Sequence, residues 1–561
     1  MLHLNLLIML DLINSDLIIN VVSHMNVIDS GKFALSSKRL YYLVHQYRTI
    51  LGPQLVACSS LENGKIRPVS DLYKDCVSKL STRPNLALAF NTFAGQELLS
   101  QLRADMPGDS IVLGAVAESI QANVRGEVQC DSSCALMMGS LSTERTQMIP
   151  FALPEGELVT LLRQLEESTP KGISMRGFWK VFIIYVCRSG YYSVDSFVSK
   201  LQARFPEATI VGGICESGYV SQECDFTVEE LKRKETSCLK EILEIYDDTQ
   251  DEIDYSNKDA LVERIFDFMD RKKYHVHDII SGIFGLALGG DVPVRSIVSR
   301  GVRSLTGTEI VCSDAPSEWF VDEVSLIRPT DEDYPFQGDP ELLQPVHVMR
   351  SLWSSITDKA ISPIKLIARF EQQPEYIGIR RPGTDGFQLN DLSPFSLMTN
   401  SVLLMTDGLP NDEASLEKAN IDFFALDPNA CLEHMDMTLG RLRQQTKDEV
   451  ILASIMFSCN GRGPKQMSML QEQMADAQRF NKHFPDTPCL GFYAGGEIGP
   501  MALVGNRDIF QKGKAAVQGF TAVFLLFIVP EAIPGAFQFD DSNENVVKYL
   551  EDQLSVIAMS S

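Results

Sequence analysis

One pattern occurs three times along the sequence, and this repeat constrains the fold more than any other feature of the chain. Each copy opens with a short apolar run, continues with apolar residues at helical spacing, and closes with a second apolar run. The helical stretch stops at a proline, and the second run ends in glycine and an acid. The copies lie near residues 85–118, 180–216 and 451–497. We therefore predict three β–α–β units, each with both strands in one sheet.

Further β-rich runs lie outside the copies, at residues 282–301 and 401–408. Together with the repeat they predict a mixed α/β fold, in which sheets covered by helices are built from repeated β–α–β units. Loops at strand ends are the usual place for binding groups in such folds. The polar loops of the three copies are therefore the first candidates for a functional site.

An acid follows the second apolar run in each copy, and we expect the three acids, Glu118, Glu216 and Glu497, to form a set. In the third copy the loop CNGRG (459–463) closes the first strand and supplies the cation Arg462. Because a right-handed crossover brings parallel strand ends to one edge of the sheet, this loop should lie beside Glu497. Two interpretations stay open. Arg462 and Glu497 form an ion pair that locks the loops, or they bind the carboxylate and amine of a zwitterion. The candidate ligand or substrate pocket comprises Cys459, Gly461, Arg462, Gly463, Gly496 and Glu497.

Composition excludes several classes of protein. The 561 residues carry a formal net charge of −24 and no dense basic run, which argues against nucleic-acid binding. Twelve cysteines without a regular framework indicate reduced thiols inside the cell. The apolar N-terminus has no basic residue before it and is interrupted by Asp11 and Asp16, so it predicts neither a signal peptide nor a membrane span. We expect a protein of the cytoplasm and nucleus that does not bind membranes.

Signals for catalysis or for a cofactor are weak. His275 and His277 lack further ligands for a metal, and Cys130 and Cys134 lack a second pair at zinc-site spacing. A phosphate-binding GxxxxGK[ST] loop does not occur. Cys459 beside Arg462 has the setting of a reactive thiolate but no oriented base near it in sequence. We predict no catalytic residue, no metal and no cofactor, and an enzyme ranks behind both functions considered below.

The motif FSCNGRG (457–463), followed by GFYAGGEIGP, resembles the signature of the FIST C-terminal domain. The strand–helix–strand unit at 85–118 and the later GGICESG resemble the FIST N-terminal domain. The resemblance implies a FIST N-terminal domain at 80–330, a FIST C-terminal domain at 331–535 and a C-terminal segment at 536–561. Domains of this family are thought to sense small ligands. A charged insertion at about 226–270 interrupts the first domain, and its acidic part, 247–259, is expected to be a mobile surface loop or a partner-binding loop.

Residues 12–44 resemble an F-box, although the usual proline and the tryptophan after the basic pair are absent. We assign residues 1–55 to an F-box-like helical domain whose apolar positions suit short amphipathic helices with a docking face. The alternative is a helical pair packed on the next domain. The residues of the adaptor-binding face are Leu12, Leu17, Val21, Met25, Leu35 and Leu40.

These resemblances imply a non-catalytic substrate receptor of an SCF (Skp1–cullin–F-box) ubiquitin ligase. Its partners would be a Skp1-type adaptor and the cullin ligase core, and its FIST domains would bind a protein substrate or a small ligand. The outcome would be ubiquitination of the substrate and its proteasomal degradation. The alternative function is an intracellular small-ligand sensor without a role in a ubiquitin ligase.

Overall fold

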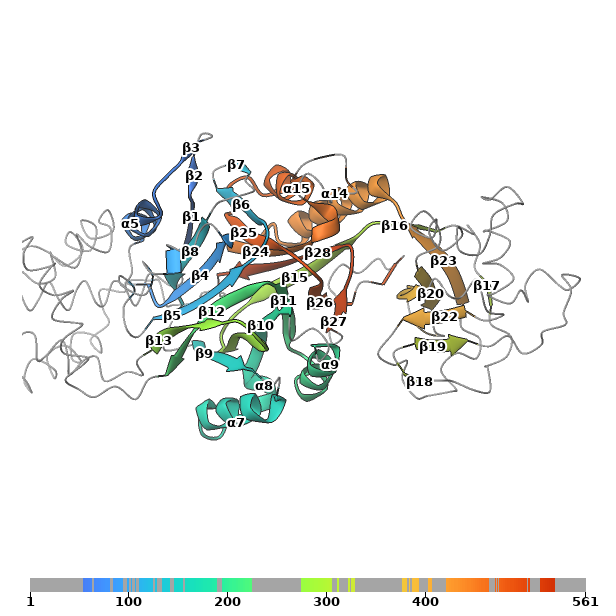
Figure 1. Ribbon diagram of the computed structural model, residues 1–561, viewed down its shortest axis with the longest axis horizontal. Helices are drawn as coiled ribbons and strands as arrows, with labels where there is room; N and C mark the ends of the chain where they lie inside the picture. Colours follow the sequence, from blue (N-terminus) through green and yellow to red (C-terminus); the bar gives the residue numbers. More distant parts are fainter. Residues whose placement is uncertain are drawn as a thin grey trace, which may run out of the picture.

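The computed structural model describes most of the three copies and the strands around them (Figure 1). The described residues are 54–62, 65–80, 84–93, 98–99, 102, 106, 110–124, 127–128, 134–141, 146–154, 157–188, 194–223, 274–304, 310–311, 321–322, 324–327, 376–380, 383, 386–392, 402–405, 420–463, 470, 472, 474–501, 503–504 and 515–529.

Each sequence copy forms a pair of parallel strands at the centre of its own six-stranded sheet. The apolar runs become strands because residues on both of their faces are buried, as is usual for parallel strands covered on two sides. The pairs are β4 (Leu86–Asn91) with β5 (Ile111–Val116), β10 (Trp179–Cys187) with β11 (Thr209–Cys215), and β24 (Ile451–Cys459) with β25 (Cys489–Ala494). The mixed α/β fold is thereby confirmed.

After its second strand, each copy sends the chain into the sheet of another copy. From β5 the chain continues into β6 (Ile120–Val124), which pairs with β25. From β11 it continues into β12 (Ser217–Glu223), which pairs with β5. From β25 it continues into β26 (Glu497–Pro500), which pairs with β11. This exchange is cyclic: each copy gives a strand to one of the other two copies and receives a strand from the other, so backbone hydrogen bonds tie each copy to both of the others.

All three sheets have the same strand order, which gives the assembly an approximate threefold arrangement. The orders are β1-β8-β4-β5-β12-β13, β9-β14-β10-β11-β26-β27 and β15-β28-β24-β25-β6-β7. The remaining strands of these sheets are β1 (Gln54–Ser59), β7 (Glu127–Val128), β8 (Cys134–Ser140), β9 (Thr146–Leu153), β13 (Tyr274–Ile279), β14 (Ile283–Gly290), β15 (Val294–Arg300), β27 (Ala515–Gln518) and β28 (Thr521–Ile528).

The inner faces of the three sheets share one hydrophobic core. At its centre, Tyr185 of β10 contacts Phe90 of β4 and Phe457 of β24, with ring centroids 6.3 and 5.9 Å apart. Phe492 of β25 packs against the same ring at 5.6 Å, close to perpendicular. Edge-to-face contacts of this kind add to the gain from burial alone. The three sheets therefore form one unit rather than three independent domains.

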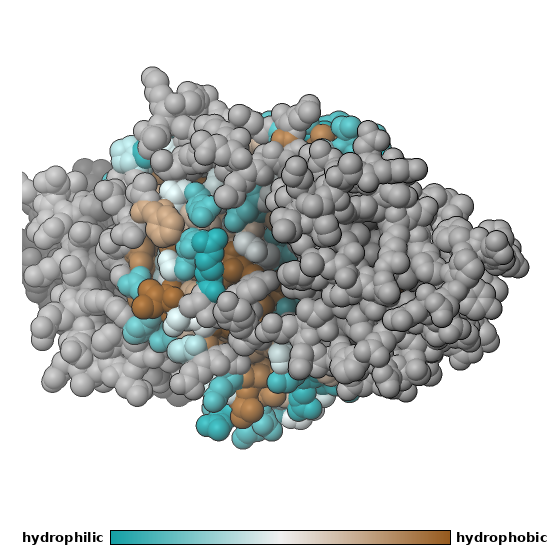
Figure 2. Space-filling view, turned by 45° about the vertical axis from the view of Figure 1, so that its right-hand side comes forward, coloured by the Kyte–Doolittle hydropathy of each residue, from teal (hydrophilic) through white to brown (hydrophobic). Residues whose placement is uncertain are grey.

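Helices cover the outer faces (Figure 1). α5 (Val69–Lys79) packs on the first sheet, and α7 (Leu158–Ser168), α8 (Met175–Phe178) and α9 (Val194–Arg204) pack on the second. α14 (Pro428–Gln445) and α15 (Ala475–His483) pack on the third. The apolar stripe of each helix faces its sheet, as an amphipathic pattern requires. In the space-filling view, hydrophobic and hydrophilic side chains lie next to one another on the described surface (Figure 2).

A fourth, eight-stranded sheet lies between β15 and α14 in the sequence and to the side of the three others in Figure 1. Its order is β16-β23-β20-β21-β22-β19-β18, with β17 also paired to β23. The strands are β16 (Val302–Ser304), β17 (Ile310–Val311), β18 (Val321–Asp322), β19 (Val324–Ile327), β20 (Tyr376–Arg380), β21 (Gln388–Leu392), β22 (Val402–Met405) and β23 (Asn420–Leu426). A two-stranded hairpin, β2 (Leu61–Glu62) with β3 (Lys65–Ile66), follows β1.

Several predicted segments lie outside the described residues: the adaptor-binding face, the acidic stretch 247–259 and the C-terminal segment 536–561. The domain boundaries stay a prediction. Within the described part of the chain, none of the helices has the length and apolar character to cross a membrane.

Candidate functional site

The register of the strands shows which residues of the three copies are equivalent. Three glycines occupy equivalent places in the second strands, opposite the exchanged strands: Gly114 opposite Tyr219, Gly212 opposite Ile498, and Gly491 opposite Gln121. In β11 the next residue, Gly213, also faces the exchanged strand, opposite Glu497. The fourth residue after Gly114 is Glu118, the fourth after Gly212 is Glu216, and the fourth after Gly491 is Gly495, so these three positions are equivalent.

Glu497 is therefore not the counterpart of the other two acids, and the expectation that the three form a set is wrong. It stands six residues after its glycine rather than four, and it already belongs to β26. The third copy has two glycines where the others have glutamate and serine. Because the three motifs look alike, the sequence does not reveal that Glu497 is displaced by two residues relative to Glu118 and Glu216. The pairing register of the strands is needed to see it.

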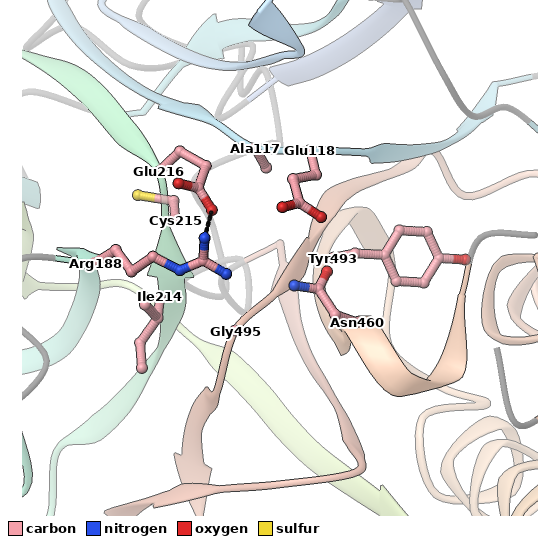
Figure 3. A pocket seen from close by; sticks show the side chains of 9 residues that line it. All are labelled: Ala117, Glu118, Arg188, Ile214, Cys215, Glu216, Asn460, Tyr493 and Gly495. Carbon is pink, nitrogen blue, oxygen red and sulfur yellow. Dashed lines mark ion pairs between the residues drawn. The ribbon is translucent and has the colours of Figure 1, made fainter. Parts of the chain in front are cut away.

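A small pocket lies where the three strand exchanges meet, and we call it the axial pocket. Its volume is about 10 Å³, room for about one water molecule. Its polar side chains, Arg188, Glu118, Glu216 and Asn460, converge on the opening from all three copies (Figure 3). The rest of the lining is Ala117, Ile214, Cys215, Tyr493 and Gly495.

Backbone hydrogen bonds between the copies hold the lining in place. The Glu216 N–H donates to the Val116 carbonyl at 3.0 Å, and the Gly495 N–H donates to the Ile214 carbonyl at 3.0 Å. The third bond, from the Tyr493 N–H to the Ser119 carbonyl, is also 3.0 Å long. Each bond joins a different pair of copies. The side chains of the axial pocket are thus mounted on paired backbone, which favours a preformed site.

The charged groups of the axial pocket are partly solvent-exposed. Arg188 Nη1 lies 3.1 Å from Glu216 Oε1, with the two side chains 63% and 23% exposed. Glu118 is exposed and points toward this pair from the other side of the pocket, and the Asn460 amide lies beside it (Figure 3). An ion pair this exposed contributes little stability, so a ligand can replace it at small cost. Two carboxylates and one guanidinium can bind a molecule that carries both charges.

One of our two interpretations required an ion pair between Arg462 and Glu497. The structure does not have this pair. The Nε and Nη2 of Arg462 donate to the two carboxylate oxygens of Asp476 at 2.9 and 2.6 Å, and Nη1 donates to the Phe520 carbonyl at 3.3 Å. Burial by itself lowers the pKa of Arg462, but the charge and hydrogen bonds of Asp476, together with the charges of Cys431 and Glu497, outweigh burial and the pKa is raised. Arg462 is thus a fully buried structural cation, and sequence reasoning missed its partner in the first turn of α15.

Glu497 is also fully buried. Its Oε2 accepts hydrogen bonds from the Thr521 N–H at 3.0 Å and from the Thr521 hydroxyl at 2.8 Å, whereas Oε1 has no hydrogen-bond partner among the described residues. Burial raises the pKa of Glu497 to about 8, and the bonds from Thr521 oppose this rise only in part. The carboxyl group is therefore largely protonated at neutral pH.

The two loops do meet at one edge of the sheet, since Cys459 lies opposite Ala494 in the parallel pair. The six predicted pocket residues nevertheless do not line the axial pocket. A Cβ added to Gly463 would lie 2.0 Å from the Tyr493 ring, and one added to Gly496 would lie 2.9 Å from Ile214, so these glycines serve close packing. Burial, followed by the charge of Glu497, raises the pKa of the Cys459 thiol to about 12, so it is not a thiolate. A ligand-binding role for the six residues stays a prediction.

Arg188 and Asn460 are the two residues with polar side chains converging on the axial pocket that sequence reasoning missed. Each follows directly on a cysteine that ends an apolar run, Cys187 in one copy and Cys459 in another. A polar residue at the same place after two corresponding runs was the available signal. Among the described residues, no three His, Cys, Asp or Glu side chains come close enough to hold a metal ion.

Comparison with known families identifies two domains. The F-box domain model matches residues 10–49, and the FIST C domain model matches residues 414–500. The chain thus carries a match to an F-box domain and a match to a FIST C domain. The F-box match contains all six residues of the predicted docking face. The FIST C match contains β24, β25 and β26 and, with the loops after β24 and β25, the pocket residues Asn460, Tyr493 and Gly495. F-box domains generally bind Skp1 within SCF complexes, where F-box proteins select the substrate rather than catalyse.

The chain is also similar to mycobacterial proteins. Uncharacterized protein Mb0898c of Mycobacterium bovis is 26% identical over 147 residues, which cover 26% of this chain and 33% of that protein. Uncharacterized protein Rv0628c of Mycobacterium tuberculosis is 28% identical over 110 residues, which cover 20% of this chain and 25% of that protein. The similarity thus spans a third or less of these relatives.

Proposed function

We propose that this chain is the substrate-recognition subunit of an SCF ubiquitin ligase in the cytoplasm and nucleus. The observation that carries the proposal is the presence of an F-box and a FIST C domain on one chain. The F-box would bind a Skp1-type adaptor and thereby the cullin ligase core. The FIST region would bind a protein substrate or a small ligand, and partner enzymes would supply the chemistry of ubiquitination, which leads to proteasomal degradation.

The axial pocket is the recognition site that we propose within the FIST region. A ligand carboxylate would replace Glu216 as the partner of Arg188, and a ligand amine would lie between the carboxylates of Glu118 and Glu216. A volume of about 10 Å³ has room for about one water-sized group, so the ligand's amine would fill it, and its carboxylate would meet the largely exposed Arg188 side chain at the opening. The axial pocket thus suits a free small zwitterion or the charged end of a longer chain.

The alternative function is a small-ligand sensor without a role in a ubiquitin ligase. The axial pocket favours it as much as it favours a substrate receptor, because the pocket alone does not reveal what the bound state signals. Binding to the Skp1-type adaptor separates the two functions.

Co-purification of the full chain with a Skp1-type adaptor tests the proposal. Leu17→Asp with Val21→Asp places two charges on the docking face and should abolish binding, because unpaired charge is costly to bury at an interface. Arg188→Ala, which changes only the axial pocket, should retain the adaptor at the wild-type level. Equal capture of the wild type and the double variant would contradict the ligase function and leave the sensor.

A further inference from the structure

Two cysteines face each other at the ends of the central strands of the second sheet. Cys187 is the last residue of β10 and Cys215 the last of β11, and they are direct partners in the parallel register. Neighbouring strands lie about 4.8 Å apart. This spacing falls within the range of about 4.4–6.8 Å between the Cα atoms of disulfide-bonded cysteines. Both cysteines are free thiols.

Each thiol donates to a backbone carbonyl, Cys187 to that of Ile279 and Cys215 to that of Val186, both at 3.6 Å. The neighbouring Cys215 thiol lowers the pKa of Cys187, whereas burial raises the pKa of Cys215 well above its usual value. Cys187 is therefore the better nucleophile of the two. An attacking thiol beside a second thiol that can resolve the product is the arrangement of a redox-sensitive cysteine pair.

The axial pocket lies next to this pair. Cys215 forms part of the pocket lining, and the ion pair of Arg188 with Glu216 is built from the residues that directly follow the two cysteines (Figure 3). Cys215 borders the pocket at the end of β11, and Cys187 lies beside it in the strand register, fully buried.

The equivalent positions of the other two copies lack such a pair. In the third copy Cys459 faces Ala494. In the first copy the corresponding residues are Thr92 and Ala117, which follow the paired Asn91 and Val116. The threefold arrangement therefore does not require a cysteine at the ends of the paired strands. Among the three copies, two facing cysteines occur at this position in the second copy alone. Cys459 supplies a control thiol at the same structural position without a facing thiol.

We propose that Cys187 and Cys215 form a peroxide-dependent disulfide beside the axial pocket. The Cys187 sulfur attacks one oxygen of hydrogen peroxide, the O–O bond breaks, and the released hydroxide takes a proton to become water. The resulting sulfenic acid on Cys187 is attacked by the Cys215 sulfur, and a second water leaves as the S–S bond forms. In sum, two thiols and one peroxide give one disulfide and two waters. The bond links the strand ends that carry Arg188 and Glu216, so the redox state of the pair sets the geometry of the pocket.

Peptide mapping of the full chain tests the proposal. The purified protein is treated with a small excess of hydrogen peroxide, unfolded in iodoacetamide and digested. A cross-linked peptide containing Cys187 and Cys215 should appear, disappear on reduction with dithiothreitol, and be the main disulfide product, while Cys459 and Cys489 stay alkylated. Cys187→Ser should abolish the cross-link. Cys215→Ser should stop the reaction at a Cys187 sulfenic acid, which dimedone traps.

The wild-type measurement decides the proposal even if a variant fails to fold. If Cys187 and Cys215 were alkylated as fully as Cys489 after peroxide treatment, the proposal would be overturned. A cross-link of Cys459 to either thiol at comparable yield would overturn it as well. The experiment needs neither the adaptor nor a pocket ligand, so its failure would leave the proposed ligase function untouched.

Discussion

The guanidinium of Arg462 and the carboxylate of Asp476 form a two-point ion pair in which neither side chain is more than 1% exposed. Asp476 lies in the first turn of α15, and Arg462 ends the short 3₁₀ turn after β24. The pair therefore fixes the helix of the third copy to the end of its first strand. Removing one partner would leave an uncompensated charge inside the protein.

Asp476→Asn should lower the free energy of unfolding by about 3–5 kcal/mol, because it leaves the Arg462 charge buried and unpaired. Urea unfolding monitored by circular dichroism measures the loss. The matched control is Arg303→Ala, which removes an ion pair with Asp427 in which Arg303 is 64% exposed, and which should cost less than about 1 kcal/mol. Equal losses for the two variants would show that the buried pair contributes no more than a surface pair.

Glu497 should make the protein less stable as the pH rises. Its folded pKa of about 8 lies above the reference value of 4.5, so between these pH values the folded chain binds a proton that the unfolded chain releases. The stabilisation is complete below pH 4.5 and is lost as the pH rises toward 8, with a slope of up to about 1.4 kcal/mol per pH unit.

Glu497→Gln removes this titration, since a neutral amide can still accept the Thr521 hydrogen bonds. Urea unfolding at several pH values should show a shallower decline between pH 5 and 8 for this variant than for the wild type, with the exposed Glu207→Gln as the control that keeps the wild-type slope. A decline as steep as in the wild type would mean that Glu497 is ionised in the folded state throughout.

Two glycines of the same motif should differ sharply in their tolerance of alanine. A Cβ at Gly491 would lie 1.7 Å from the Met456 carbonyl oxygen, whereas a Cβ at Gly495 would have its nearest neighbour, Ile214, at 3.7 Å. Gly491→Ala should therefore cost about 3 kcal/mol or prevent folding, and Gly495→Ala should stay within about 0.5 kcal/mol of the wild type. Thermal unfolding compares them, and similar melting temperatures would contradict the close approach at Gly491.

Arg188→Ala should abolish the binding of small zwitterions to the axial pocket, because it removes the cation for their carboxylate. Glycine, the smallest such probe, should raise the melting temperature of the wild type, whereas acetate and methylammonium, each with one of the two charges, should raise it less. The exposed Arg204→Ala, at the end of α9, is the matched control and should respond like the wild type. If glycine stabilised Arg188→Ala as much as the wild type, the axial pocket would not be its site.

The acidic stretch 247–259 should be the first site of proteolytic cleavage, with the two fragments remaining associated. It contains too few apolar residues to offset the entropy of ordering the chain. Deletion of these residues should lower the melting temperature by less than about 2 °C. A much larger loss, or first cleavage elsewhere, would indicate that the stretch is packed.

Local patterns in the sequence were sufficient to predict the three parallel strand pairs and the crossover helices α9 and α15 of the second and third copies. Each pair is specified by apolar runs and helical spacing within about 40 residues, and burial on both faces makes such runs strands whatever lies around them. The adjacency of the loops after β24 and β25 followed from the handedness of the crossover.

Only the tertiary structure decided which loops form a site. The exchanged strands pair with partners far away in sequence, as when β6 meets β25, and no local periodicity encodes such a partner. The exchange brings Glu118, Glu216, Arg188 and Asn460 together from three copies and turns Arg462 and Glu497 into the interior. The motif of the third copy indicated that charged and polar residues follow its strands. The pairing register, which depends on the other copies, determined which of these residues face the axial pocket.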